Sequence, residues 1–92
     1  MNDLRATADR MIEDYRTKAE WSVASQIVLR CVDVLCMETF TAARISALSL
    51  PLVGEHLAIP YVSVQLGKMR KAGLLRTRRV SGVSMYEVNL PM

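Results

Sequence analysis

Six basic side chains without an acidic neighbour lie in one segment of the chain, between Pro60 and Gly82. They are Lys68, Arg70, Lys71, Arg76, Arg78 and Arg79. Ammonium and guanidinium groups at this density attract phosphate oxygens and donate hydrogen bonds to them, so the cluster is the electrostatic footprint of a phosphate-binding face. The chemistry that these residues offer is recognition of a polyanion.

The distribution of charge along the chain agrees with this interpretation. Residues 1–41 carry five basic and seven acidic side chains, whereas residues 42–92 carry seven basic and two acidic ones. The net charge of +3 therefore hides an acidic N-terminal part and a basic C-terminal part. We expect the C-terminal part to meet a polyanion and the N-terminal part to be a poor partner for one.

The other residues that could do chemistry are isolated. His56 is the only histidine, and the second histidine of a zinc-protease helix is missing. Cys31 and Cys36 lie in an apolar helical pattern that turns them roughly 140° apart, so they can neither pair there nor chelate a metal without other ligands. Asp33 and Glu38 have the same spacing and make a poor acid–base pair. We expect no enzymatic activity, no metal site and no cofactor, and two reduced core cysteines.

The basic segment begins on a predicted helix over Pro60–Ala72. Val62, Leu66 and Met69 recur at helical spacing and form an inward apolar seam. A proline suits the first helical turn, and Gly73 suits the left-handed residue that closes a helix. The predicted outward positions are Tyr61, Val64, Gly67, Lys68 and Lys71.

After Gly73 the pattern changes from helical to extended. The runs Leu74–Val80 and Val83–Leu90 flank a short Ser81-Gly82 turn, which predicts a β-hairpin. In the second run every second residue from Tyr86 is apolar, so one face of the strand is expected to be buried. A helix that runs straight into a basic hairpin is the helix-plus-wing arrangement.

Residues 2–20 form a charged, amphipathic segment. Its apolar residues have spacings of 4, 3 and 4 and give a seam of two heptads, formed by Leu4, Ala8, Met11 and Tyr15. The seam can pack on its own domain or on the matching helix of a second subunit. We favour the homodimer, because a chain of 92 residues buries a modest fraction of its surface and no other segment offers a partner surface.

The next helical pattern, Trp21 to about Met37, has an apolar arc broad enough for a central core helix. The arc includes both Val23 and Val34. The sequence leaves two starts open for this helix. Ser22 can be its N-cap, or the helix can continue unbroken from the first one, since no glycine or proline separates them.

Two shorter helical patterns precede the basic segment. The first is a short helix capped at Thr39 or Thr41. The second is predicted to have Ser49 as its N-cap and Pro51 in its first turn. Its inward residues are expected to be Leu50, Val53 and Leu57.

Residues 49–75 resemble the bacterial winged helix-turn-helix transcription regulators. The resemblance depends on the run SLPLVGEHLAIP, on Val62-Ser63, and on the leucine and methionine spacing that leads to AGLL. Glu55, Ile59-Pro60, Ala72–Leu75, Arg78-Arg79 and Tyr86 fall at matching places, and the match covers residues ~41 to 90, most of the chain. It implies an α+β winged helix-turn-helix fold with an additional N-terminal helix and a two-stranded β wing. We expect a single domain over residues 1–92, with a dimerisation helix at 1–20 and the winged-helix core at 21–90.

Helix-turn-helix geometry places the N-terminal part of the second helix in the major groove of DNA. Gln65 could then pair with adenine in a bidentate manner, and Val64 could touch a thymine methyl group. The basic hairpin would meet phosphates or the minor groove. The predicted DNA-binding residues are Tyr61, Ser63, Val64, Gln65, Lys68, Arg70, Lys71, Arg76, Arg78 and Arg79.

The predicted function is sequence-specific binding of double-stranded DNA by a homodimeric transcriptional repressor. Its operator would be pseudo-palindromic, with half-sites about one helical turn (~10 bp) apart. The alternative is a winged-helix protein–protein interaction module whose basic face docks an acidic partner. The sequence has no signal peptide and no run of about 18 apolar residues, so we expect a cytoplasmic chain that does not associate with membranes.

Overall fold

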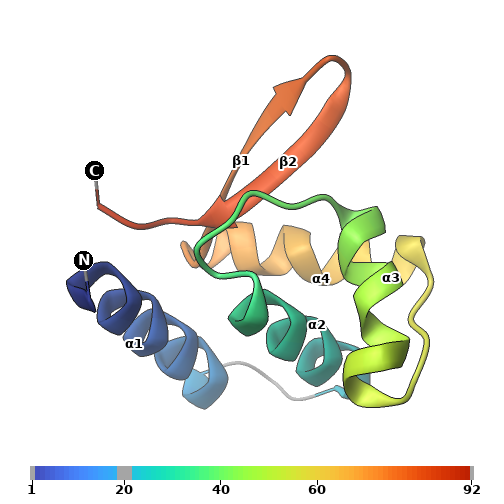
Figure 1. The fold of residues 1–92 in the computed structure, drawn as a ribbon, viewed down its shortest axis with the longest axis horizontal. Helices are drawn as coiled ribbons and strands as arrows, with labels where there is room; N and C mark the ends of the chain where they lie inside the picture. The colour runs from blue at the N-terminus through green and yellow to red at the C-terminus, as the bar shows by residue number, and fades with distance from the viewer. Residues whose placement is uncertain (1, 19–21, 92) are drawn as a thin grey trace.

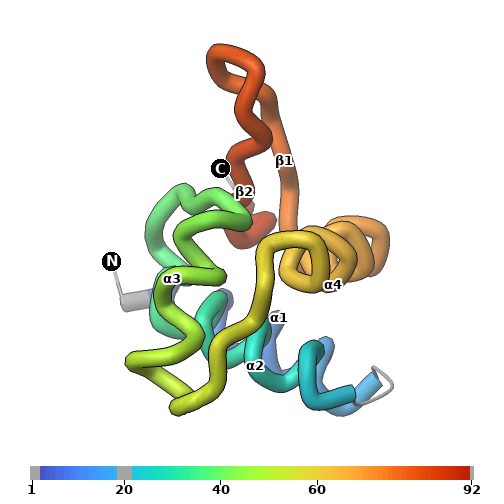
Figure 2. The backbone as a smooth tube through the Cα atoms, turned by 90° about the vertical axis from the view of Figure 1, so that its right-hand side faces the viewer, coloured from blue at the N-terminus to red at the C-terminus, as the bar shows by residue number. Residues whose placement is uncertain are grey.

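The computed structural model describes residues 2–18 and 22–91 (Figure 1). Within this part of the chain the order of elements is α1 (Asn2–Lys18), α2 (Val23–Val34), α3 (Ala42–Val53), α4 (Ile59–Lys71), β1 (Leu75–Val80) and β2 (Val83–Val88). The helices pack around one core, and the β-hairpin rises from the C-terminal end of α4 (Figures 1 and 2). The α+β class with an added N-terminal helix and a two-stranded wing is confirmed.

The N-terminal part contains two helices rather than one continuous helix. Ser22 has extended backbone angles, and its hydroxyl accepts a hydrogen bond of 3.0 Å from the N–H of Ser25, so Ser22 is the N-cap of α2. Val28 and Val32 of α2 have no exposed surface. The buried arc is narrower than predicted, because Val23 and Val34 are the end residues of the helix and remain 63% and 50% exposed.

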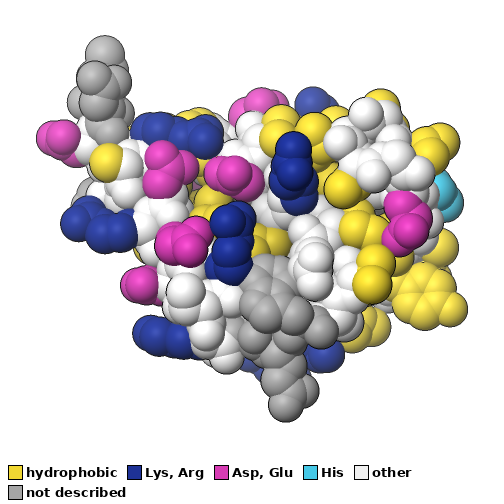
Figure 3. All heavy atoms as spheres, turned by 90° about the horizontal axis from the view of Figure 1, so that it is seen from below, with side chains coloured by type: hydrophobic (Ala, Val, Ile, Leu, Met, Phe, Trp, Pro, Cys, Tyr) yellow, Lys and Arg dark blue, Asp and Glu magenta, His cyan; other side chains and the backbone are white. Residues whose placement is uncertain are grey.

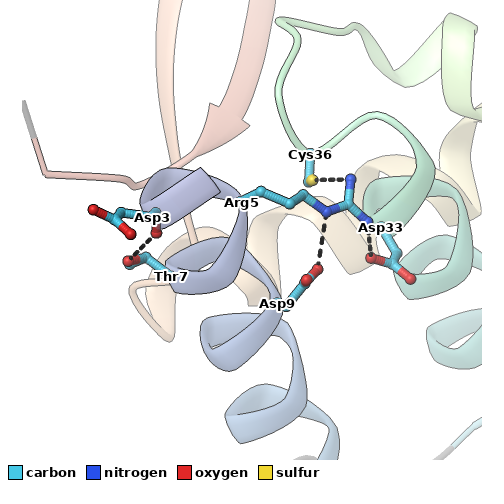
Figure 4. Close-up of polar contacts among 6 residues, drawn as sticks. All are labelled: Asp3, Arg5, Thr7, Asp9, Asp33 and Cys36. Carbon is cyan, nitrogen blue, oxygen red and sulfur yellow. Dashed lines mark hydrogen bonds and ion pairs between the residues drawn. The ribbon is translucent and has the colours of Figure 1, made fainter. Parts of the chain in front are cut away.

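Arg5 links α1 to the C-terminal end of α2 (Figure 4). Its guanidinium donates to the Sγ atom of Cys36 at 2.9 Å and lies 3.4 Å from Asp33 and 3.1 Å from Asp9 of its own helix. Partly exposed ion pairs of this kind contribute little to stability. Burial of apolar residues such as Ala8, which has no exposed surface, is the larger contribution that holds α1 in place.

α3 is one helix where the sequence predicts two. The hydroxyl of Thr41 accepts a hydrogen bond of 3.1 Å from the N–H three residues on, which makes Thr41 the N-cap, and Gly54 ends the helix with a φ of +79°. The prediction that Ser49 caps a helix and that Pro51 lies in its first turn is therefore wrong. The helix tolerates Pro51 in its last turn, where the missing N–H removes one backbone hydrogen bond shortly before the helix ends.

The inward face of α3 also differs from the prediction. Leu50 and Val53 are 54% and 38% exposed, whereas Ile45 and Ser49 are fully buried. The difference follows from the helix start at residue 42, which sets a register that the sequence analysis assigned to a separate, later helix. Leu57, the third residue predicted to point inward, packs partly buried against the core.

The Ser49 side chain joins α3 to the turn that precedes α4. Its hydroxyl donates to the carbonyl of Ser46 at 2.7 Å and accepts from the N–H of Leu57 at 3.0 Å. The Ser46 hydroxyl in turn donates to the carbonyl of Leu57 at 2.7 Å. These bonds satisfy the polar groups of the turn, and they fix α3 and α4 as a helix-turn-helix pair.

α4 has the predicted inward seam, and its C-terminal end directs the chain into the hairpin. Val62, Leu66 and Met69 have no exposed surface. Gly73 has a φ of +87° and donates its N–H to the carbonyl of Arg70 at 3.0 Å, while the N–H of Leu74 donates to the carbonyl of Met69 at 3.0 Å. These are the two hydrogen bonds of a Schellman motif, so the predicted role of Gly73 is confirmed.

The hairpin has the predicted turn. Ser81 and Gly82 have φ values of +51° and +80°, as both central residues of a type I′ turn require. β1 and β2 pair antiparallel from Leu75 opposite Val88 to the turn. Phe40, in the loop after α2, exchanges two backbone hydrogen bonds of 2.8 Å with Tyr86 and so ties β2 to the helical core.

We expect Ser49→Ala to lower the free energy of unfolding by about 1–3 kcal/mol, because the buried N–H of Leu57 loses its acceptor. Urea denaturation measures the change. Ser63→Ala is the matched control, since Ser63 is exposed on α4, and it should stay within about 0.5 kcal/mol of the wild type. Equal stabilities of the two variants would contradict a role of Ser49 in holding the turn.

Candidate nucleic-acid interface

Five of the six clustered basic residues are exposed and lie on two adjoining elements. Lys68, Arg70 and Lys71 belong to the last turn of α4, and Arg78 and Arg79 belong to β1. None of the five forms an ion pair with another residue in the described part of the chain. Arg79 donates to the carbonyl of Gly82 at 2.7 Å, which holds its side chain near the hairpin turn. Cations without local counter-charges give this region a positive potential.

Arg76 is engaged within the protein instead. Its Nε atom lies 3.1 Å from a carboxylate oxygen of Glu87, its cross-strand neighbour, and its NH1 atom donates to the carbonyl of Leu90 at 2.8 Å. The side chain is 31% exposed. With its donors used at the base of the hairpin, Arg76 fixes the wing internally, and its assignment as a phosphate contact is not supported by this geometry.

Gln65 points inward, contrary to its predicted place at the base edges. The residue is 7% exposed and lines a groove formed with Tyr15 of α1 and Ser25 of α2. The position is covered because α1 packs beside α2 and so extends the buried side of α4 beyond its apolar seam. Burial in this groove also raises the pKa of Tyr15, an effect that the nearby Ser25 hydroxyl partly offsets.

The outward face of α4 carries the other predicted contact residues of this helix. Tyr61 and Val64 are 64% and 56% exposed, and Ser63 is exposed beside them. A Cβ atom added at Gly67 would have nothing within 4 Å, so a larger residue would fit in the free chain. The middle of this face is therefore small and low, between the neutral first turns of the helix and the basic last turn.

The four residues predicted for dimerisation have different environments within one chain. Leu4 is 41% exposed, whereas Ala8 has no exposed surface and contacts the chain's own core. Met11 and Tyr15 are partly buried and also pack against that core. Part of the seam is thus used within the domain, which is the alternative that the sequence left open, and Leu4 remains available to a second subunit. Acidic and basic side chains are interspersed over α1 (Figure 3).

Arg44 is a basic residue that the sequence analysis did not include. It lies in the first turn of α3, is exposed, and forms no ion pair with the other described residues. It precedes the basic segment by more than twenty residues, so clustering along the sequence could not identify it. Its position just after the Thr41 N-cap is the only signal that the sequence offered.

The isolated reactive residues occupy structural positions. Cys31 and Cys36 are buried free thiols, and burial raises the pKa of both, partly offset by Arg30 for Cys31 and by Arg5 for Cys36. His56 is exposed, with its Nε2 atom 3.5 Å from the Ser46 hydroxyl. Within residues 2–18 and 22–91, no three histidine, cysteine or carboxylate side chains gather in a way that could hold a metal ion.

None of the helices in the described ranges is both long and apolar enough to span a bilayer. No family model matches the sequence, and no curated protein matches it. The known proteins that are similar are therefore found through the fold.

Two solved structures share that fold. One is the solution NMR structure of the homodimeric winged helix-turn-helix DNA-binding domain of a possible ArsR-family transcriptional regulator from Mycobacterium bovis, with a TM-score of 0.60 and 14% identity over 91% of this chain. The chain spans 66% of the length of that domain. The other is the crystal structure of a predicted DNA-binding transcriptional regulator from Escherichia coli, with a TM-score of 0.57 and 18% identity over 96% of this chain and 82% of that one. The chain has a winged helix-turn-helix fold.

Gly67→Ala should raise the free energy of unfolding by about 0.5–1 kcal/mol, because alanine favours a helix interior and meets open space here. Thermal denaturation of the two proteins measures the change. Gly82→Ala is the contrasting control and should be destabilising, since Gly82 has a φ of +80°. A loss of stability in Gly67→Ala would mean that Gly67 is required by the fold itself.

Proposed function

We propose that this winged helix-turn-helix chain binds duplex DNA as a homodimeric transcriptional repressor. In the proposed complex α4 lies in the major groove of each half-site, and the wing lies along the flanking backbone. The observation that carries the proposal is the set of exposed, unpaired basic residues on α4 and β1, namely Lys68, Arg70, Lys71, Arg78 and Arg79. Both similar structures are described as DNA-binding.

The positions of these cations match the two kinds of contact that the proposal requires. The basic residues of α4 belong to its last turn, so they can reach phosphates at the groove edge while the first turns face the bases. Arg78 and Arg79 are successive strand residues, whose side chains point to opposite faces of the hairpin. The wing can therefore meet a phosphate backbone with a cation on either face.

The homodimer is part of the proposal, with α1 as its contact. The mycobacterial domain with the same fold is homodimeric. In this chain Leu4 leaves 41% of its surface exposed near the start of α1, although its seam neighbour Ala8 is fully buried. We propose contacts through Leu4 and the exposed parts of Met11 and Tyr15, and a pseudo-palindromic operator that mirrors the two-fold symmetry.

The DNA-binding proposal predicts that the double variant Arg78→Ala/Arg79→Ala binds duplex DNA more weakly and with less salt dependence. Removing two phosphate contacts per protomer should reduce the slope of log K against log salt concentration by about 2. Fluorescence polarisation with a labelled duplex, titrated at several salt concentrations, measures both quantities.

The matched control is Arg10→Ala/Arg30→Ala, which removes the same charge from exposed residues of α1 and α2. Its salt slope should stay close to that of the wild type. If the two double variants lose affinity equally, binding depends on net charge alone and the proposed interface is wrong. If neither variant nor wild type binds duplex, the basic face has another kind of partner.

The dimer proposal predicts that Leu4→Asp shifts the protein toward the monomer in sedimentation equilibrium. An aspartate in the first turn of α1 interacts favourably with the helix dipole, so the helix itself should persist. Val23→Asp, at the 63% exposed first residue of α2, is the control and should leave the association unchanged. An unaltered dimer in Leu4→Asp would exclude α1 as the contact, and a wild-type monomer would exclude the dimer.

A further inference from the structure

The first turns of α4 present an outward surface of short and apolar side chains. Val62 and Leu66 have no exposed surface, so the opposite side of the helix is the one that a groove would meet. The exposed residues before Lys68 are Ile59, Pro60, Tyr61, Ser63 and Val64, none of them charged. Ile59 is 48%, Tyr61 64% and Val64 56% exposed, which is a large apolar area for a surface helix.

This surface lacks the side chains that read bases through paired hydrogen bonds. Those readers are arginine or lysine for guanine, asparagine or glutamine for adenine, and a carboxylate for cytosine. Between residues 59 and 67 only Gln65 belongs to these types, and it is 7% exposed in the groove toward Tyr15 and Ser25. The remaining polar groups there, the Ser63 and Tyr61 hydroxyls, can each form a single hydrogen bond without distinguishing the bases strongly.

The one apolar feature of a base edge in the major groove is the C5 methyl group of thymine. Resting on the proposed DNA-binding function, we propose that α4 reads thymine methyl groups, with Val64 as the main contact, and does not read adenine through Gln65. The proposal replaces a hydrogen-bond code by a pattern of methyl groups. The recognised sequence should accordingly contain thymines at fixed positions in each half-site.

Gly67 supplies the geometry that such a contact needs. Residues 64 and 67 are neighbours on one helix face, being three apart. A valine side chain is short, so Val64 can touch a methyl group only if the helix backbone comes close to the base pairs. A Cβ at residue 67 would project into open space within 4 Å, and its absence leaves room for this approach. No contact within the described chain explains a glycine here.

The test begins with selection of the best duplex from a randomised library by the full chain. Each thymine of that duplex is then replaced by 2′-deoxyuridine, which retains base pairing and hydrogen-bonding groups and removes only the methyl group. Fluorescence polarisation at one fixed salt concentration gives the Kd of each duplex. We expect binding about fourfold weaker at the thymines contacted by α4, as burial of one methyl-sized group predicts.

Val64→Ala identifies the residue responsible. Because Val64 is 56% exposed, the substitution should leave the fold intact, and Val34→Ala, at a 50% exposed site on α2, is the matched control. At the thymine read by Val64, the change to deoxyuridine should weaken wild type and Val34→Ala about fourfold and Val64→Ala less than about twofold. Equal effects in all three proteins would overturn the assignment to Val64.

The outcomes separate this inference from the function on which it rests. If a motif is selected and every deoxyuridine duplex binds as tightly as the parent, methyl reading is wrong and sequence-specific DNA binding stands. If duplexes bind without any selected motif, methyl reading is again wrong, and only phosphate binding remains. If no duplex binds at all, the proposed function and this inference fail together.

Discussion

Burial of one face of α4 is the constraint on which the other elements depend. Val62, Leu66 and Met69 have no exposed surface, and α4 contacts α2, α3 and β1. Burying each such side chain stabilises the fold by about 1.5–3 kcal/mol, more than the exposed ion pairs elsewhere contribute. Because a helix is rigid, the same packing also sets which residues face outward. The core therefore determines the direction in which Val64 and Lys68 point.

The wing inherits its orientation from the end of this helix. The Schellman hydrogen bonds at Gly73 and Leu74 turn the chain directly from α4 into β1. Arg76, bonded to Glu87 and to the carbonyl of Leu90, then braces the base of the hairpin. Phe40 adds a bridge from the other side, through its backbone pairing with Tyr86. The exposed arginines of the wing are thus held in a fixed relation to α4.

The sequence predicted what local chemistry controls. The seam of α4, the left-handed Gly73 and the Ser81-Gly82 turn each depend on residues a few positions apart, and all were correct. Ser49 was misassigned because a serine before a proline resembles an N-cap, while its actual partner is the N–H of Leu57 in the next turn. The burial of Gln65 depends on where α1 packs, and no local pattern encodes that.

The basic residues of α4 and of the wing differ in how strongly they indicate a polyanion. Lys68, Arg70 and Lys71 lie in the last turn of a helix, where cations are favourable for the helix dipole alone. Arg78 and Arg79 have no such reason to be present. Charges do protect a two-stranded sheet from pairing with other edges, but one would serve that purpose. Two adjacent, exposed arginines with no acidic partner among the described residues leave a negative binding partner as the simplest physical explanation. The inference of a nucleic-acid interface therefore depends on the wing more than on the helix beside it.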